Sequence, residues 1–347
     1  MRAQSLPRIV KPVATLALLA LAGAGLAACS TGSSGNPAPT VTVTHDATVP
    51  ATQPGTSGGT TPSTSTTAAG PTRPVHIKTL NSDGQTYGVG MPIIAYFSKK
   101  ITDASTLVAD TKVTADGQPV EGGWYFETSA AIKGYPIEGH WRPKTYWPAH
   151  SQVHVDLPMK GQSAGNGLAY DDNLTLDFAI GAAHILTVNN ATHHLTVVSD
   201  GKKWGTFPIS LGARDTPTLE GTKVIMERLT SVCMSGNPPN GPAYHECGVK
   251  WDQRLTYGGE YLHAAPWNCT GAPGCVGPAN NIGHGNSSNG CTNLRPNDAE
   301  RLYHYLNIGD VVRFPHTDGP RMRLGDGYGD WNLSWAQWST GGLISTT

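Results

Sequence analysis

A cysteine and a histidine in the C-terminal half of the chain have the surroundings that thiol chemistry requires. His263 lies in the short segment Tyr261–Trp267, which is predicted to begin as a strand, and Cys291 follows a glycine-rich loop at residues 283–290. A histidine can lower the pKa of a thiol and carry its proton, and glycines let backbone N–H groups face an anion. We therefore predict that Cys291 is a nucleophile and that His263 is its base.

The other cysteines can be paired or assigned elsewhere. Two local disulfides are predicted across Gly/Pro-rich segments, Cys233 with Cys247 and Cys269 with Cys275. Cys29 belongs to the N-terminal signal described below, so Cys291 remains alone among the six cysteines. A buried, inert thiol is the alternative. The four loop cysteines lack the C-x₂₋₄-C spacing of zinc knuckles, and no metal site is predicted.

The N-terminus has the pattern of a secretory signal over residues 1–28. Three basic residues precede an apolar stretch, residues 12–28, that is short for a membrane span. Small residues followed directly by Cys29 match the bacterial lipoprotein box, which predicts cleavage before Cys29 and its acylation. The chain is then expected to be exported and anchored to the outer face of the cell membrane. An uncleaved anchor and a plain signal cut near Ala28 are the alternatives.

The next segment, residues 29–74, is predicted to be a tether. It consists mainly of Thr, Ser, Pro and Gly and has almost no large apolar side chain to bury. Proline-rich stretches keep such a linker extended, which holds the folded part away from the membrane surface. The net charge of −1 gives no electrostatic case for nucleic acid as a partner.

The folded part is expected to be mainly β, beginning with an immunoglobulin-like sandwich at residues 75–178. Short apolar runs alternate there with turns, and Asp116–Gly117 is a hairpin signal. No segment with a helical period interrupts these runs. Nothing in this region gathers residue types that carry catalysis.

A second β-rich unit is predicted at residues 179–317. Turn signals at Asn189–Asn190 and Asp200–Gly201 divide its first strands, and one main helix is expected at residues 297–306 after the catalytic cysteine. Asn297 is predicted to cap that helix, with Glu300 completing a capping box. The Trp-rich tail, residues 318–347, is expected to pack on this second unit.

Three separated motifs resemble the L,D-transpeptidases, which share the YkuD-type catalytic domain. They are H-x-A-P-W at residues 263–267, S-x-G-C-x-N-L at residues 288–294, and G-D-W-N-x-x-W-x-Q-W at residues 329–338. The resemblance covers residues 179–342, and it is greatest to multidomain members with immunoglobulin-like modules. It implies a cysteine acyltransferase of the bacterial cell wall that needs no cofactor.

The resemblance also implies a role for individual residues. Cys291 attacks, His263 accepts its proton, and the backbone carbonyl of Ala264 is the third member of the site. Backbone N–H groups at residues 289–291 would stabilise an oxyanion. The implied substrate-binding and oxyanion positions are Met234, Tyr244, Gly258, Gly259, Trp267, Ser288, Asn289, Gly290 and Asn293.

One position departs from the family motif. The histidine that relatives carry two residues before the cysteine is replaced here by Asn289. The predicted base His263 is retained, but substrate orientation or oxyanion geometry near Gly290 is expected to differ. His284, five residues earlier, is the candidate substitute, and an ordinary loop histidine is the alternative.

The family chemistry implies attack of Cys291 on a peptidoglycan tetrapeptide stem, release of the terminal D-alanine and formation of a thioester. The side-chain amine of an acceptor stem's third residue then receives the acyl group in a 3→3 cross-link, and carbapenems would acylate the same thiol. A carboxypeptidase or endopeptidase using the same thioester is the alternative enzyme. A non-catalytic wall-binding lipoprotein is the alternative of another class, and a zinc hydrolase lacks a ligand set.

Overall fold

The computed structural model describes residues 72–129 and 131–344. All of the described residues belong to one compact unit. The predictions for the signal at residues 1–28, for Cys29 and for most of the linker lie outside the described residues. Among the described residues, no helix is both long and apolar enough to cross a membrane.

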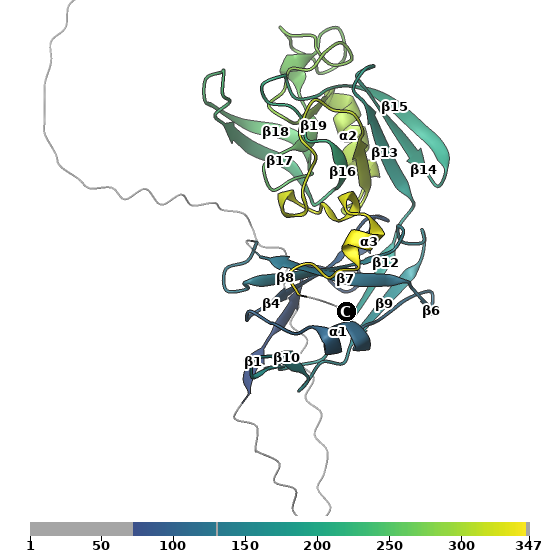
Figure 1. The fold of residues 1–347 in the computed structure, drawn as a ribbon. Helices are drawn as coiled ribbons and strands as arrows, with labels where there is room; N and C mark the ends of the chain where they lie inside the picture. Colours follow the sequence, from purple (N-terminus) through teal and green to yellow (C-terminus); the bar gives the residue numbers. More distant parts are fainter. Residues whose placement is uncertain (1–71, 130, 345–347) are drawn as a thin grey trace, which may run out of the picture. The chain divides into compact units, whose positions relative to one another are not determined.

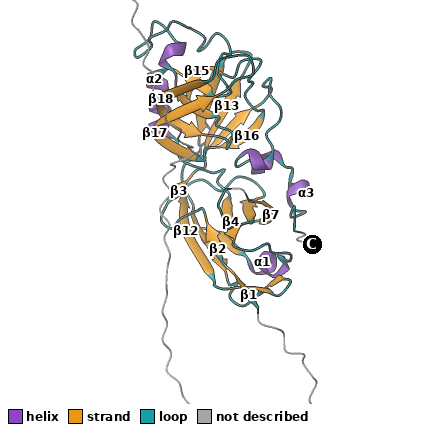
Figure 2. Ribbon diagram, turned by 90° about the vertical axis from the view of Figure 1, so that its left-hand side faces the viewer, coloured by secondary structure: helices purple, strands orange, loops and turns teal. Residues whose placement is uncertain are grey.

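The first module is a β-sandwich, as predicted (Figures 1 and 2). One sheet has the order β2 (Ile77–Thr79), β4 (Ile93–Phe97), β8 (Ile137–Pro143), β7 (Gly122–Thr128). The other has the order β3 (Thr86–Tyr87), β12 (Leu174–Ile180), β9 (Gln152–Leu157), β5 (Lys112–Ala115), β6 (Gln118–Pro119). A small third sheet contains β1 (Arg73–Val75), β11 (Leu168–Tyr170) and β10 (Ser163–Gly165). Along β9, buried and more exposed residues alternate, as expected for a strand with one face on the core.

Two elements of this module differ from the sequence prediction. A short helix, α1 (Ser105–Asp110), interrupts the strands and buries only Leu107, so its six residues show no helical period. β8 was not predicted because the alternating polar residues Glu138, His140 and Arg142 interrupt its apolar run, although every residue of the strand is buried. β12 also runs to Ile180, two residues past the predicted end of the module.

The second module, residues 184–314, is built on one nine-stranded sheet. Its order is β16 (Gly221–Val224), β21 (Val311–Phe314), β13 (His184–Asn189), β14 (His194–Ser199), β15 (Lys202–Ser210), β20 (Thr292–Leu294), β19 (Tyr261–Ala264), β18 (Tyr244–Arg254), β17 (Glu227–Gly236). Asp200 and Gly201 both have positive φ, which is the geometry of the predicted two-residue hairpin turn.

The main helix of this module, α2, spans Pro296–Tyr305 and follows β20 directly. Its N-cap is Arg295 and no side chain caps it, so the predicted cap at Asn297 is wrong by two positions. Proline fits the first helical position because its fixed φ suits a helix and its missing N–H would have no partner there. Ala299 and Leu302 form its buried face.

The C-terminal tail packs on both modules, whereas the prediction placed it on the second module alone. It contains η2 (Leu324–Asp326), η3 (Asp330–Asn332) and α3 (Trp335–Trp338). The Asn332 side chain bonds to the backbone of Thr222 in the second module. On the immunoglobulin-like module, the indoles of Trp331 and Trp338 donate to the carbonyls of Gly90 and Gly123. A buried tryptophan usually donates its indole N–H to a hydrogen-bond acceptor, and these two carbonyls supply one.

Candidate active site

Two neighbouring parallel strands place the predicted nucleophile and base side by side. β19 pairs with β20 so that His263 lies opposite Asn293, and Cys291 immediately precedes β20. A parallel pair requires a long crossover, which here comprises η1 (Pro266–Asn268) and the predicted disulfide between Cys269 and Cys275. Cys291 and His263 line one pocket of about 550 Å³.

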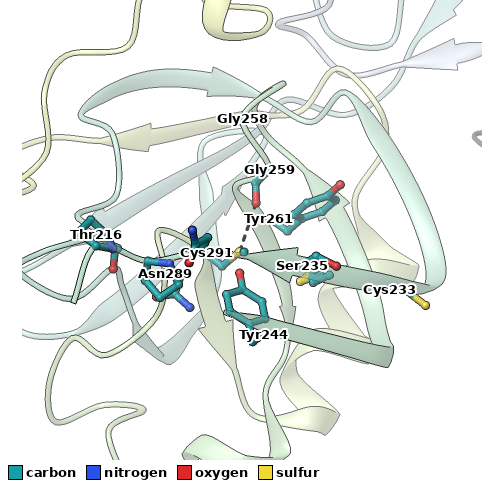
Figure 3. Close-up of a pocket in the computed structure, with 14 residues that line it drawn as sticks. Thr216, Cys233, Ser235, Tyr244, Gly258, Gly259, Tyr261, Asn289 and Cys291 are labelled. Carbon is teal, nitrogen blue, oxygen red and sulfur yellow. Dashed lines mark hydrogen bonds between the residues drawn. The ribbon is translucent and has the colours of Figure 1, made fainter. Parts of the chain in front are cut away.

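Cys291 is the free cysteine of the described residues and is largely buried. Its thiol donates to the carbonyl of Gly259 at a sulfur–oxygen distance of 3.5 Å, which Figure 3 marks with a dashed line. Burial raises the pKa of the Cys291 thiol to about 12, although the backbone of Tyr261 opposes the shift. The resting group is therefore a protonated thiol at neutral pH.

His263 is buried and held by one backbone partner. Its Nδ1 lies 2.9 Å from the carbonyl oxygen of Ala264, the contact that the resemblance implied. Because a carbonyl can only accept, Nδ1 carries the proton and Nε2 has its lone pair available for a thiol proton. Burial lowers the pKa of His263 to about 4, so the imidazole is neutral at rest.

A second pocket, of about 380 Å³, also opens on Cys291 (Figure 3). The two pockets share Met234, Pro238, Tyr244, Asn289 and Cys291. Gly258 and Gly259 line the smaller pocket, and the larger contains Trp267, Ser288 and Asn293. One thiol can thus be reached from two differently lined sides.

The hairpin of β17 and β18 forms one wall of both pockets. The disulfide of Cys233 and Cys247 links its two strands, as predicted. Tyr244 pairs with Gly236 across the hairpin, and its hydroxyl points toward Cys291 in Figure 3. Met234 lies on the opposite strand of the same hairpin. The cross-link therefore holds a wall that carries two of the predicted substrate positions.

The loop before Cys291 is held by hydroxyl groups. Ser288 donates from Oγ to the carbonyl of Cys291, and Thr218 donates to the carbonyl of Gly290 at 2.8 Å. Gly290 has a φ of 105°, which a side chain would strain. Unlike the other predicted positions, Gly290 is absent from the lining of both pockets.

Asn289 lies at the position predicted to distinguish this site. It is exposed and lines both pockets beside the thiol. His284 is also exposed but lines neither pocket, so it does not take the place of the motif histidine. The proposed proton path from Cys291 to His263 does not require a side chain at residue 289.

A buried ion pair behind the loop was missed by the sequence prediction. Lys223 on β16 donates to Glu260, which also accepts from the backbone of Leu219. A Cβ on Gly290 would lie 3.6 Å from Cγ of Glu260, so the pair directly supports the loop that carries the thiol. The two residues are 37 positions apart, and no local motif links them.

Comparison with known proteins agrees with this geometry. Residues 183–314 match the model of the L,D-transpeptidase catalytic domain, and residues 29–163 match the model of a bacterial Ig domain. The second module belongs to the L,D-transpeptidase family. The mainly β fold, with an immunoglobulin-like domain ahead of this one, is confirmed.

Two similar proteins from Mycobacterium tuberculosis are named as L,D-transpeptidases. L,D-transpeptidase 2 is 31% identical over 77% of this chain, and L,D-transpeptidase 5 is 31% identical over 76%. The chain spans 63% and 56% of the lengths of these two relatives. Among solved structures, that of L,D-transpeptidase 3 from the same organism is 27% identical with a TM-score of 0.52, over 68% of this chain and 96% of that one.

A solved LD transpeptidase in complex with imipenem is also similar. It is 26% identical to this chain with a TM-score of 0.54, and the match covers 68% of this chain and 96% of that one. L,D-transpeptidase 3 has likewise been solved with a faropenem-derived adduct, at 26% identity.

Proposed function

We propose that this protein is a peptidoglycan L,D-transpeptidase that works through a cysteine thioester. The family of the second module, the paired Cys291 and His263, and the retained motifs support the proposal. The observation that carries it is the access to Cys291 from two pockets. A transpeptidase must first take an acyl group from a donor stem, whose amine leaves, and then transfer that group to an acceptor amine, and two approaches to one thiol suit that sequence.

The reaction begins from a neutral thiol and a neutral imidazole. As sulfur attacks the carbonyl of the third stem residue, its proton passes to Nε2 of His263. Backbone N–H groups at residues 289–291 stabilise the oxyanion, each worth about 3–4 kcal/mol in measured hydrolases. Protonated His263 then gives the proton to the departing D-alanine amine, which leaves a thioester on Cys291.

The second half reverses the proton transfers. The side-chain amine of an acceptor stem attacks the thioester and transfers a proton to His263. Collapse of the new oxyanion expels the sulfur, which is reprotonated by His263, and the product is a 3→3 cross-link.

Purified protein incubated with disaccharide-tetrapeptide tests the activity. Cross-linked dimer is expected from the wild type, and no product from Cys291→Ala. Tripeptide monomer without dimer would show that water is the acceptor and would identify a carboxypeptidase instead.

Acylation by a carbapenem tests the nucleophile separately. The imipenem complex and the faropenem-derived adduct of the similar proteins support the choice of probe. Intact-mass measurement is expected to show one adduct on the wild type and none on Cys291→Ala. An adduct that persists in the variant would rule out Cys291 as the site.

We also propose that the mature chain is a lipoprotein on the outer face of the cell membrane. The support is the basic and apolar N-terminal pattern that ends at Cys29. Metabolic labelling with a fatty acid is expected to mark the wild-type protein and not Cys29→Ala. Equal labelling of both would contradict this localisation.

A further inference from the structure

A second cluster of reactive side chains lies in the immunoglobulin-like module, where no catalytic grouping was expected. Glu127 on β7 and Glu138 on β8 are directly opposed in the strand pairing. His140 lies two residues beyond Glu138 and therefore on the same face of the sheet. Two carboxylates opposed in this way repel each other unless a proton or a cation lies between them.

The cluster is deeply enclosed. Glu138 is 4% exposed and His140 is 1% exposed, while Glu127 is half-buried. In the described part of the chain, Nε2 of His140 and Oε1 of Glu127 have no hydrogen-bond partner although both atoms are buried. Such atoms cost free energy unless something satisfies them. They therefore point to a ligand that completes the site.

The distances fit a metal ion better than a direct hydrogen bond. Nε2 of His140 lies 3.7 Å from Oε1 of Glu138, which is too long for a hydrogen bond. Two ligands of a tetrahedral zinc ion, each at about 2.1 Å, lie about 3.4 Å apart. One atom from each of the three side chains falls within 4.8 Å of the others, so a small contraction would close the site.

The surrounding groups orient these three side chains. Nδ1 of His140 lies 2.8 Å from a carboxylate oxygen of Asp330 in the tail, and that contact directs Nε2 toward the two glutamates. Metal-ligating histidines usually donate their other N–H to a carboxylate in this way. Ser129 donates to the second oxygen of Glu138, which leaves the first facing His140.

We propose that Glu127, Glu138 and His140 bind a divalent transition-metal cation, with water completing the coordination. An imidazole and two carboxylates are a ligand set for zinc or manganese. The ion would neutralise the opposed glutamates and, through Asp330, fasten the tail to β8. Its role is structural, because the residues that bind it do not line the pockets at Cys291.

Zinc titration of the chelator-treated full chain tests the site. One Zn²⁺ per chain is expected by elemental analysis, with a rise in Tm of about 5 °C at saturating zinc. Glu127→Gln keeps the shape but removes one ligand charge, and at least about 10-fold weaker binding is expected. Glu121→Gln, an exposed residue of the same module, is the matched control and should bind as the wild type does.

Side chains at two other positions could bind zinc, and one variant at each position tests this. Cys291→Ser removes the active-site thiol, and His245→Gln alters the exposed group beside the Cys233–Cys247 disulfide. Both should retain the zinc. Loss of binding in either one, or unchanged binding in Glu127→Gln, would overturn the proposal.

X-ray absorption of the zinc-loaded wild type gives a measurement that does not depend on a variant's folding. One imidazole nitrogen with oxygen neighbours is expected around the metal. A sulfur neighbour, or no stoichiometric zinc at all, would contradict the site.

Discussion

The two central residues, Cys291 and His263, are both neutral before reaction because burial disfavours their charged forms. The site therefore does not store a thiolate, which would be exposed to oxidants in the absence of substrate. In the proposed mechanism, the nucleophile is generated only as the carbonyl arrives, when the proton moves to His263. A low intrinsic reactivity with small thiol reagents follows from this arrangement.

The neutral pair determines the pH dependence of acylation. His263, with a pKa of about 4, loses the ability to accept a proton only below that value. The Cys291 thiol, with a pKa of about 12, stays protonated up to strongly alkaline pH. The rate of carbapenem acylation should therefore be nearly constant between about pH 6 and pH 9 and fall in acid. Stopped-flow absorbance would measure it, and a steep rise centred near pH 7 would contradict the neutral pair.

Replacing Asn289 with the family's histidine tests how far kcat/KM depends on the residue at this position. The side chain is exposed and lies beside both pockets, away from the contact of His263 with Ala264. Asn289→His is expected to change kcat/KM for the donor stem by less than about 10-fold, whereas His263→Ala should lower it by at least about 100-fold. Comparable losses in both variants would show that residue 289 takes part in proton transfer.

At the scale of elements, the hairpin of β17 and β18 depends on its disulfide. Constraining a loop of about 15 residues is worth about 3 kcal/mol in the entropy model, and here the effect is local to the pocket wall. Cys233→Ser/Cys247→Ser should raise KM several-fold with little change in the Tm of the whole chain. Hydrogen exchange at residues 233–247 should accelerate, while Cys269→Ser/Cys275→Ser leaves that segment unchanged.

The buried pair of Lys223 and Glu260 connects β16 to the segment before β19. Glu260→Gln leaves a fully buried ammonium without its anion, which costs about 3–5 kcal/mol of the free energy of unfolding. Adding Lys223→Met should recover much of that loss, because the uncompensated charge is then gone. Urea unfolding of the single and double variants would measure both effects, and equal losses would argue against charge as the cause.

The elements predicted from the sequence were those with a local signal. The residue types of Asp200–Gly201 alone predict a hairpin. The motifs around His263 and Cys291 predict a strand at the histidine and a loop before the cysteine. The N-cap of α2 was misplaced because Asn297 competed with the equally local signal of Pro296. Local patterns thus gave the candidate thiol and base, which the structure places in one pocket, but only approximate element ends.

Contacts between distant segments could not be predicted in the same way. The polar residues Glu138 and His140 interrupt the apolar run of β8, and their burial depends on the elements that cover both faces of the strand. Lys223 and Glu260 meet only because the sheet brings β16 near the loop of Gly290. Such pairs depend on the strand order, which a single sequence does not state.

At the scale of the whole molecule, the tail connects the two modules. Trp338 is fully buried, and its indole donates to Gly123 of the immunoglobulin-like module. Trp338→Ala should lower the free energy of unfolding by about 3–5 kcal/mol, as large core truncations do. By calorimetry, one transition is expected for the wild type and two for Trp338→Ala. Trp335→Ala is the control, since that side chain is not fully buried.

The contact between His140 and Asp330 joins residues 190 positions apart. Ribosomes make the chain from its N-terminus, so β7 and β8 exist long before the residues that cover them. Until Asp330 is made, Nδ1 of His140 lacks the carboxylate that binds it in the folded chain. A chain truncated before Asp330 would keep all nine strands of the second module, yet His140 in the first module would lack its carboxylate partner.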